Sequence, residues 1–112
     1  MRTREEQMDA ATALAGSGPA YLFYLAEAME DAGQQLGFTP EEARRLVCQT
    51  LVGAAAMLAE TSDGPAGLRA TVTSKGGTTA AACDTLDELH VHDALVKAIG
   101  AAHERGRELG AA

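Results

Sequence analysis

Apolar positions recur at helical spacing along most of the chain, and this pattern predicts an all-helical protein. No stretch alternates apolar and polar residues as a half-buried strand does. Three segments show the spacing most clearly, at residues 22–36, 43–58 and 95–109. Their apolar positions are Leu22, Ala26, Met29, Gly33, Leu36; Ala43, Leu46, Val47, Thr50, Leu51, Ala54, Met57, Leu58; and Leu95, Val96, Ile99, Ala102, Gly106, Leu109.

Capping and breaking residues predict where the first helices begin and end. Thr3 and Glu6 have the spacing of a capping box, and the helix that they open should end at Gly16. Pro19 suits the first turn of a second helix, which Gly37 should close.

The same signals predict the later helices. Thr39 and Glu42 form a second capping box, which opens a third helix that runs to about Glu60 and contains Gly53. Since an interior glycine costs a helix about 1 kcal/mol, we expect a close helix crossing at Gly53. A short helical piece should follow at 65–71, a fourth main helix at 78–89, and a final helix after an interruption at 90–92.

Composition limits the core that this chain can build. It has 112 residues, enough for one domain, with 46% hydrophobic but only 4% aromatic residues, no Trp and 24 alanines. Small side chains allow close helix packing but fill little volume. We therefore expect apolar stripes that a single copy leaves uncovered, and a stable homodimer that covers them.

The net charge of −7 argues against nucleic acid or an anionic membrane as a partner. No apolar run reaches the length of a membrane span, and no secretory signal is evident near the start. Cys48 and Cys83 lack metal-ligand spacing and are expected to be buried free thiols. These features indicate a cytoplasmic protein.

The histidines do not predict a metal site. His90 and His92, followed by Asp93, carry suitable donor atoms, but two histidines two positions apart diverge on a helix. A loop with solvated side chains is the preferred interpretation, and His103 is expected on the surface. No metal is therefore expected.

The stretch Val72–Thr79 is the strongest candidate for chemistry. Gly76 and Gly77 stand between hydroxyl residues, directly before a helix start whose free N–H groups and dipole favour an anion. Ser74, Thr78 and Thr79 add hydroxyl donors, so the stretch suits a carboxylate or a phosphate. The alternative is an ordinary glycine turn with a threonine N-cap.

Gly16, Ser17 and Gly18 do not form a dinucleotide-binding fingerprint, because Tyr21 stands where the third glycine belongs and a helical pattern precedes them. A hinge between two helices is the simplest interpretation. A ligand contact is the alternative.

Taken together, Thr12–Tyr21 and Val72–Thr79 resemble the C-terminal domain of pyrroline-5-carboxylate reductase. Shorter matches stand between them in the family's order: Glu27-Ala28, Leu36-Gly37-Phe38, Gln49-Thr50 and Gly53-Ala54-Ala55. The resemblance extends from about Glu6 to Leu109. Two departures are Lys75, where the family usually has Pro, and Leu89–His92, which replaces a glycine-rich turn.

The resemblance implies one domain over residues 1–112, an all-α bundle of about five helices, like the C-terminal domain of 6-phosphogluconate dehydrogenase and dimerising. It implies a part in reducing 1-pyrroline-5-carboxylate to L-proline, the last step of proline biosynthesis. The substrate carboxylate is expected to bind at Ser74, Gly76, Gly77 and Thr78. Thr79 is expected to be the catalytic contact to the ring nitrogen, with Ser17 and Gly18 in a secondary role near the active site.

In the family a separate Rossmann domain binds NAD(P)H, and no such domain is expected in this chain. The chain alone is therefore expected to bind no cofactor and to be inactive. Expected partners are a second copy, in a homodimer or an oligomer of dimers, the imino acid, and a Rossmann domain if the chain is a fragment. The alternatives are a non-catalytic imino-acid-binding protein and a purely structural helical dimerisation module.

Overall fold

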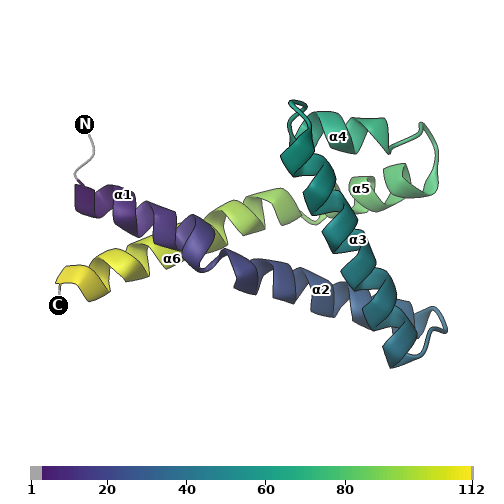
Figure 1. Ribbon diagram of the computed structural model, residues 1–112, viewed down its shortest axis with the longest axis horizontal. Helices are drawn as coiled ribbons and strands as arrows, with labels where there is room; N and C mark the ends of the chain where they lie inside the picture. The colour runs from purple at the N-terminus through teal and green to yellow at the C-terminus, as the bar shows by residue number, and fades with distance from the viewer. Residues whose placement is uncertain (1–3, 112) are drawn as a thin grey trace. The chain divides into compact units, whose positions relative to one another are not determined.

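A computed structural model describes residues 4–111, which form six α-helices and one π-helical segment and contain no strand (Figure 1). These are α1 (Arg4–Ala11), η1 (Thr12–Gly16), α2 (Gly18–Gln35), α3 (Pro40–Glu60), α4 (Pro65–Thr71), α5 (Thr78–Glu88) and α6 (Val91–Ala111). The all-α prediction is confirmed. Of the capping box predicted at the start, Thr3 lies outside the described residues.

The chain divides into two units, one made of the residues up to 23 and from 85 onward, the other of residues 24–84. In the first unit α1 runs into η1, and α6 packs against both of them (Figure 1). Ala13 of η1 is 2% exposed. Ile99, Ala102, His103 and Gly106 of α6 are half-buried and recur at helical spacing, as expected for a packed face.

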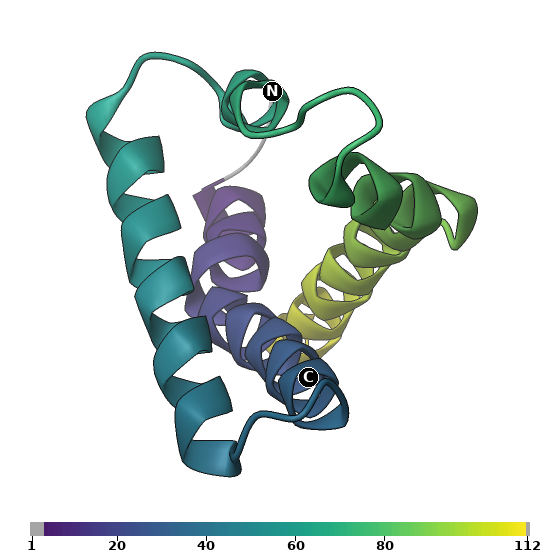
Figure 2. The same ribbon diagram turned by 90° about the vertical axis from the view of Figure 1, so that its right-hand side faces the viewer.

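In the second unit a glycine turn joins α2 to α3 (Figure 2). Gly37 has φ of 107°, the Phe38 N–H donates to the Gly33 carbonyl at 3.1 Å, and the Gly37 N–H donates to the Gln34 carbonyl at 3.1 Å. This pair of bonds is the Schellman motif. The predicted closure of the second helix at Gly37 is therefore confirmed.

The start of α3 also matches its prediction. The Glu42 N–H donates to the Thr39 hydroxyl at 3.1 Å, and the Thr39 N–H donates to the Glu42 carboxylate at 2.9 Å. Nearby, the Arg44 guanidinium lies 2.9 Å from the Glu30 carboxylate, whose hydrogen bond raises the pKa of that guanidinium. Because the Arg44 side chain is largely exposed, this pair adds little stability.

The close approach of two helices occurs at Gly33, not at Gly53 as expected. A Cβ atom at Gly33 would lie 3.2 Å from the Ala43 Cβ, which is tighter than ordinary contact. No atom of the described residues lies within 4 Å of a Cβ built at Gly53. The prediction of a crossing at Gly53 is wrong within one copy, because this position of α3 faces no other described helix of the same chain.

The predicted interruption before the last helix is present, one residue earlier than expected, at Leu89 and His90, since α5 ends at Glu88 and α6 begins at Val91. Two predictions about the exposure of side chains are wrong. Cys48 is exposed and Cys83 is half-buried, although both are free thiols in helices. His103 is half-buried, and its Nε2 atom is buried without a hydrogen-bond partner, because it lies on the packed face of α6.

Few residues are buried within one copy. Among those described, only Ala13 and Ala43, each 2% exposed, and Val47, 6% exposed, reach the interior. Large apolar side chains are exposed on α2, α3, α5 and α6, as Phe23 of α2 is to 69%. No helix of residues 4–111 has the length and apolar character needed to cross a membrane.

His90 occupies the left-handed region with φ of 56°, where a side chain other than glycine costs about 1–2 kcal/mol. We therefore expect His90→Gly to raise the free energy of unfolding by about 1 kcal/mol, as measured by urea denaturation. His92→Gly is the control. It places glycine inside α6 and should lower stability, so a loss in both variants would contradict the assignment.

Candidate anion-binding site at the start of α5

The segment that leads to the site is tied to the end of α4. The Val72 N–H donates to the Leu68 carbonyl at 3.3 Å, and the Thr73 N–H donates to the Ala70 carbonyl at 3.2 Å. The Thr73 hydroxyl also donates to the Arg69 carbonyl at 2.6 Å. These bonds satisfy carbonyls at the end of α4 and fix where the next turn begins.

Residues 74–77 form a tight turn. The Gly77 N–H donates to the Ser74 carbonyl at 3.0 Å, and Gly76 has φ of 74°. A positive φ at the third residue, with Lys75 outside that region, defines a type II turn, which requires glycine or asparagine there. The turn therefore explains Gly76, and it places Lys75 where this turn type favours proline.

Gly77 is required for a different reason. A Cβ atom at this position would collide with the Ser74 side chain and lie 3.2 Å from the Ser74 carbonyl oxygen. Gly77 is also the N-cap of α5, because its carbonyl accepts the first helical hydrogen bond, from Ala81 at 3.1 Å. The absence of a side chain lets the Ser74 hydroxyl lie directly against the helix start.

The groups at this helix start have few partners within the chain. The N–H groups of Thr78, Thr79 and Ala80 occupy the first turn, where a helix offers no acceptor. The hydroxyls of Ser74, Thr78 and Thr79 make no hydrogen bond within the described residues. The predicted alternative, a threonine N-cap, is not what the structure has, since the N-cap is Gly77.

The local charge favours an anion at α5. The first turns of α1, α3 and α6 contain Glu or Asp, which offset the positive end of the helix dipole. The first turns of α2, α4 and α5 contain no acidic residue. Two of these helices, α2 and α5, begin at the two stretches that the sequence singles out, although the chain as a whole is acidic.

Ser17 and Gly18 lie at the start of α2, in the first unit, whereas Ser74–Thr79 lie in the second. Ser17 is half-buried, its N–H donates to the Thr12 carbonyl at 2.8 Å, and its carbonyl accepts from Ala20 at 3.0 Å. The junction is a hinge between helical segments, as expected. The role of both residues near an active site stays a prediction.

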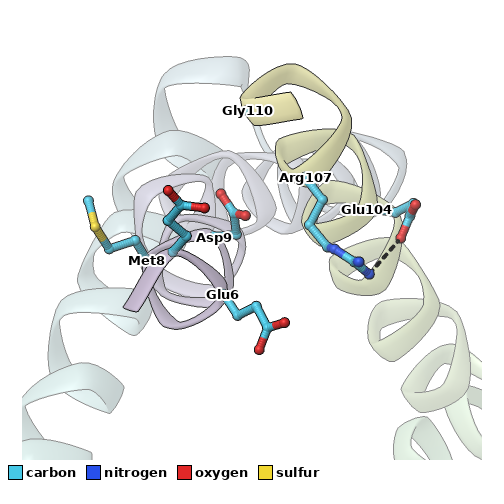
Figure 3. A pocket seen from close by; sticks show the side chains of 7 residues that line it. Glu6, Met8, Asp9, Glu104, Arg107 and Gly110 are labelled. Atoms are coloured by element: carbon cyan, nitrogen blue, oxygen red, sulfur yellow. Dashed lines mark ion pairs between the residues drawn. The ribbon is translucent and has the colours of Figure 1, made fainter. Parts of the chain in front are cut away.

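A hollow with a volume of about 680 Å³ lies between α1 and α6 (Figure 3). It is lined by Glu5, Glu6, Met8, Asp9, Glu104, Arg107 and Gly110. Arg107 is the one cationic residue of this lining, and its guanidinium is already paired with the Glu104 carboxylate at 3.6 Å. Carboxylates repel an anionic ligand, so the start of α5 is the better candidate for an anion.

Nothing in the described range points to a metal or a dinucleotide. No group of three His, Cys, Asp or Glu side chains there is placed to hold an ion. Gly16 ends a π-helical segment, and Ser17 and Gly18 follow it, whereas a dinucleotide-binding turn follows a strand. The residues present therefore do not fit NAD(P)H.

A helical chain with many exposed apolar side chains has the character of a dimerisation domain. The family profile described as pyrroline-5-carboxylate reductase dimerisation matches residues 5–109. The chain belongs to this family and is a pyrroline-5-carboxylate reductase dimerisation domain.

Curated relatives agree with this assignment. The pyrroline-5-carboxylate reductase of Pseudomonas aeruginosa is 47% identical over 105 residues, covering 94% of this chain and 38% of that protein. That of Synechocystis is 41% identical over 106 residues, covering 95% of this chain and 40% of that protein. The chain thus spans about two-fifths of the length of these relatives.

Solved structures give the same fold. A pyrroline-5-carboxylate reductase from Coxiella burnetii superimposes with a TM-score of 0.91 at 44% identity, over 96% of this chain and 40% of that one. The Plasmodium falciparum pyrroline carboxylate reductase, solved with NADP bound, has a TM-score of 0.91 at 32% identity, over 98% of this chain and 42% of that one.

One part of the site region was not predicted. The Tyr21 hydroxyl donates to the Ala13 carbonyl at 2.6 Å, next to a π-helical segment that periodicity does not indicate. A single hydrogen bond between two residues produces no repeating pattern in the sequence from which it could be predicted. The one available signal was a tyrosine close after Gly-Ser-Gly-Pro.

The type II turn gives a direct test at Lys75. Proline fits the second position of such a turn, so Lys75→Pro should raise the free energy of unfolding by about 0.4–1 kcal/mol by restricting the unfolded chain. Thermal unfolding measures this. Lys75→Ala is the control, expected to change little, and a clear drop for Lys75→Pro alone would show that the turn has another conformation.

Proposed function

We propose that this chain binds the carboxylate of 1-pyrroline-5-carboxylate at Ser74–Thr79, as the substrate-binding and dimerisation part of an NAD(P)H-dependent reductase that forms L-proline. One observation supports it most. Hydrogen-bond donors without acceptors gather at the start of α5, in a turn that two glycines make possible. The family of the chain supplies the substrate class.

Each residue of the site has a role in this proposal. A carboxylate accepts hydrogen bonds from the Ser74 hydroxyl and from the N–H groups of the first turn of α5. Gly76 and Gly77 keep the backbone free of side chains, so that the ligand reaches these groups. The Thr79 hydroxyl is assigned to the ring nitrogen, and Lys75 adds a positive charge nearby.

The hydride donor is assigned to another part of the enzyme. A nicotinamide supplies hydride when bound, but the described residues do not fit a dinucleotide. We place it on a separate Rossmann domain and expect no turnover by this chain alone. The contribution of this chain is to bind and orient the imino acid.

A second copy is proposed to cover the exposed apolar faces. Burying one large aliphatic side chain is worth about 1.5–3 kcal/mol, and Leu25, Leu46, Met57 and Leu58 are each about half exposed in one copy. Gly53 of α3, with open space around it, would let a helix of the partner approach closely. Assembly into higher oligomers of dimers is a further step of the same proposal.

Binding is tested by titrating the ¹⁵N-labelled chain with L-proline, the proposed product. We expect weak, saturable shifts of the Gly76, Gly77 and Thr79 amides, because the hydride-donor side of the pocket is absent. Ser74→Ala combined with Thr79→Val should abolish the shifts and leave helicity unchanged. Thr71→Val is the control, since the Thr71 hydroxyl donates to the Gly67 carbonyl outside the site. Shifts confined to other residues would refute the assignment.

Dimerisation is tested by sedimentation equilibrium at micromolar concentration. We expect twice the chain mass of 11.5 kDa, because a single copy leaves its apolar faces exposed. A monomer at every accessible concentration would contradict this.

A further inference from the structure

The segment before the Gly16–Gly18 junction is wound more widely than an α-helix. Thr12–Gly16 is π-helical, and the Ser17 N–H donates to the Thr12 carbonyl at 2.8 Å, five residues back. In an α-helix the same N–H would donate to Ala13, four residues back. In the π turn the Ala13 carbonyl therefore lacks the Ser17 N–H, which would be its donor in an α-helix.

The Tyr21 hydroxyl takes the place of that donor. It donates to the Ala13 carbonyl at 2.6 Å, across eight residues. Ala13 is 2% exposed, so water cannot readily donate a hydrogen bond to its carbonyl. A buried acceptor without a partner is unfavourable, and the π register is thus compatible with burial only while the hydroxyl is present.

We propose that the Tyr21 hydroxyl selects the π register of Thr12–Gly16 and acts as a positioning residue for Ser17 and Gly18. Without the hydroxyl, the buried carbonyl regains a donor if Ser17 returns to α-helical pairing. The two registers differ in which carbonyl the Ser17 N–H bonds, and the tyrosine decides between them.

The hydrogen-bond register of Thr12–Gly16 affects the position of the residues that follow this segment. A change of one residue turns the next part of a helix by about 100° and moves it by about 1.5 Å along the axis. Ser17 and Gly18 come directly after the π turn. Insofar as they have the secondary role near an active site that the family resemblance implies, Tyr21 determines where they lie.

Pro19 is the competing cause of the irregular winding. A proline within a helix lacks an N–H and clashes with the carbonyl four residues before it, which here belongs to Ala15. Pro19 explains why the helix cannot continue regularly. It does not explain why Ser17 bonds to Thr12 while Ala13 bonds to a side chain.

The test measures scalar couplings through hydrogen bonds in the deuterated chain. In the unaltered protein the Ser17 nitrogen should couple to the Thr12 carbonyl carbon. In Tyr21→Phe that coupling should vanish and one to the Ala13 carbonyl carbon should appear, with helicity and assembly mass unchanged. Persistence of the Thr12 coupling in Tyr21→Phe would overturn the proposal.

Two controls separate the hydroxyl from other causes. Tyr24→Phe removes an oxygen from the same helix at a side chain that is 76% exposed, and it should leave the Thr12 coupling intact. Pro19→Ala should also leave it intact. Transfer of the Ser17 bond to Ala13 in Pro19→Ala would show that proline, and not tyrosine, sets the register.

A measurement on the unaltered protein covers the case in which Tyr21→Phe does not fold. In mixed H₂O and D₂O, slow hydroxyl exchange should split the Cζ signal of Tyr21 but not that of Tyr24. A single Tyr21 signal would contradict a lasting bond to Ala13.

Proline titration separates this inference from the proposed function. In Tyr21→Phe, shifts at Gly76–Thr79 should persist, while any shift at Ser17 and Gly18 seen in the unaltered chain should be lost. If the unaltered chain does not respond to proline at all, the proposed function fails, and the couplings still decide the role of Tyr21.

Discussion

The constraint on which this structure depends is that the chain cannot bury its apolar side chains by itself. Its helices are rich in alanine, and the described residues bury only Ala13, Ala43 and Val47. Large side chains lie along the outsides of long helices instead. Hydrophobic burial is the main favourable term in folding, so the energy that holds such helices in place has to come from contacts with other surfaces.

The candidate site depends much less on a packed core. Its geometry follows from a type II turn, a glycine N-cap and the Thr73 hydroxyl, which donates to the Arg69 carbonyl, all within residues 69–81. Such local structure places hydrogen-bond donors together in a chain that is acidic overall, and these donors are the proposed site for an anion. The proposed binding turn is therefore built from neighbouring residues, whereas the long helices need contacts with another surface.

The sequence predicted what local chemistry decides. The Thr39 capping box, the end of the second helix at Gly37 and the turn before α5 all formed as expected, because each depends on residues within one or two turns. Predictions that needed tertiary contacts were less successful. Gly53 has no close neighbour in the chain, His103 is half-buried, and the π register at Thr12–Gly16 depends on a hydroxyl eight residues away from its acceptor.

The most direct test of this account is whether folding and association are coupled. Urea unfolding followed by circular dichroism at chain concentrations from about 1 to 100 µM measures this, because a partner that binds only the folded state raises stability by mass action. The account predicts that the unfolding midpoint rises steadily with concentration. A midpoint that is the same at every concentration would show that one copy holds its helices together unaided, and would contradict it.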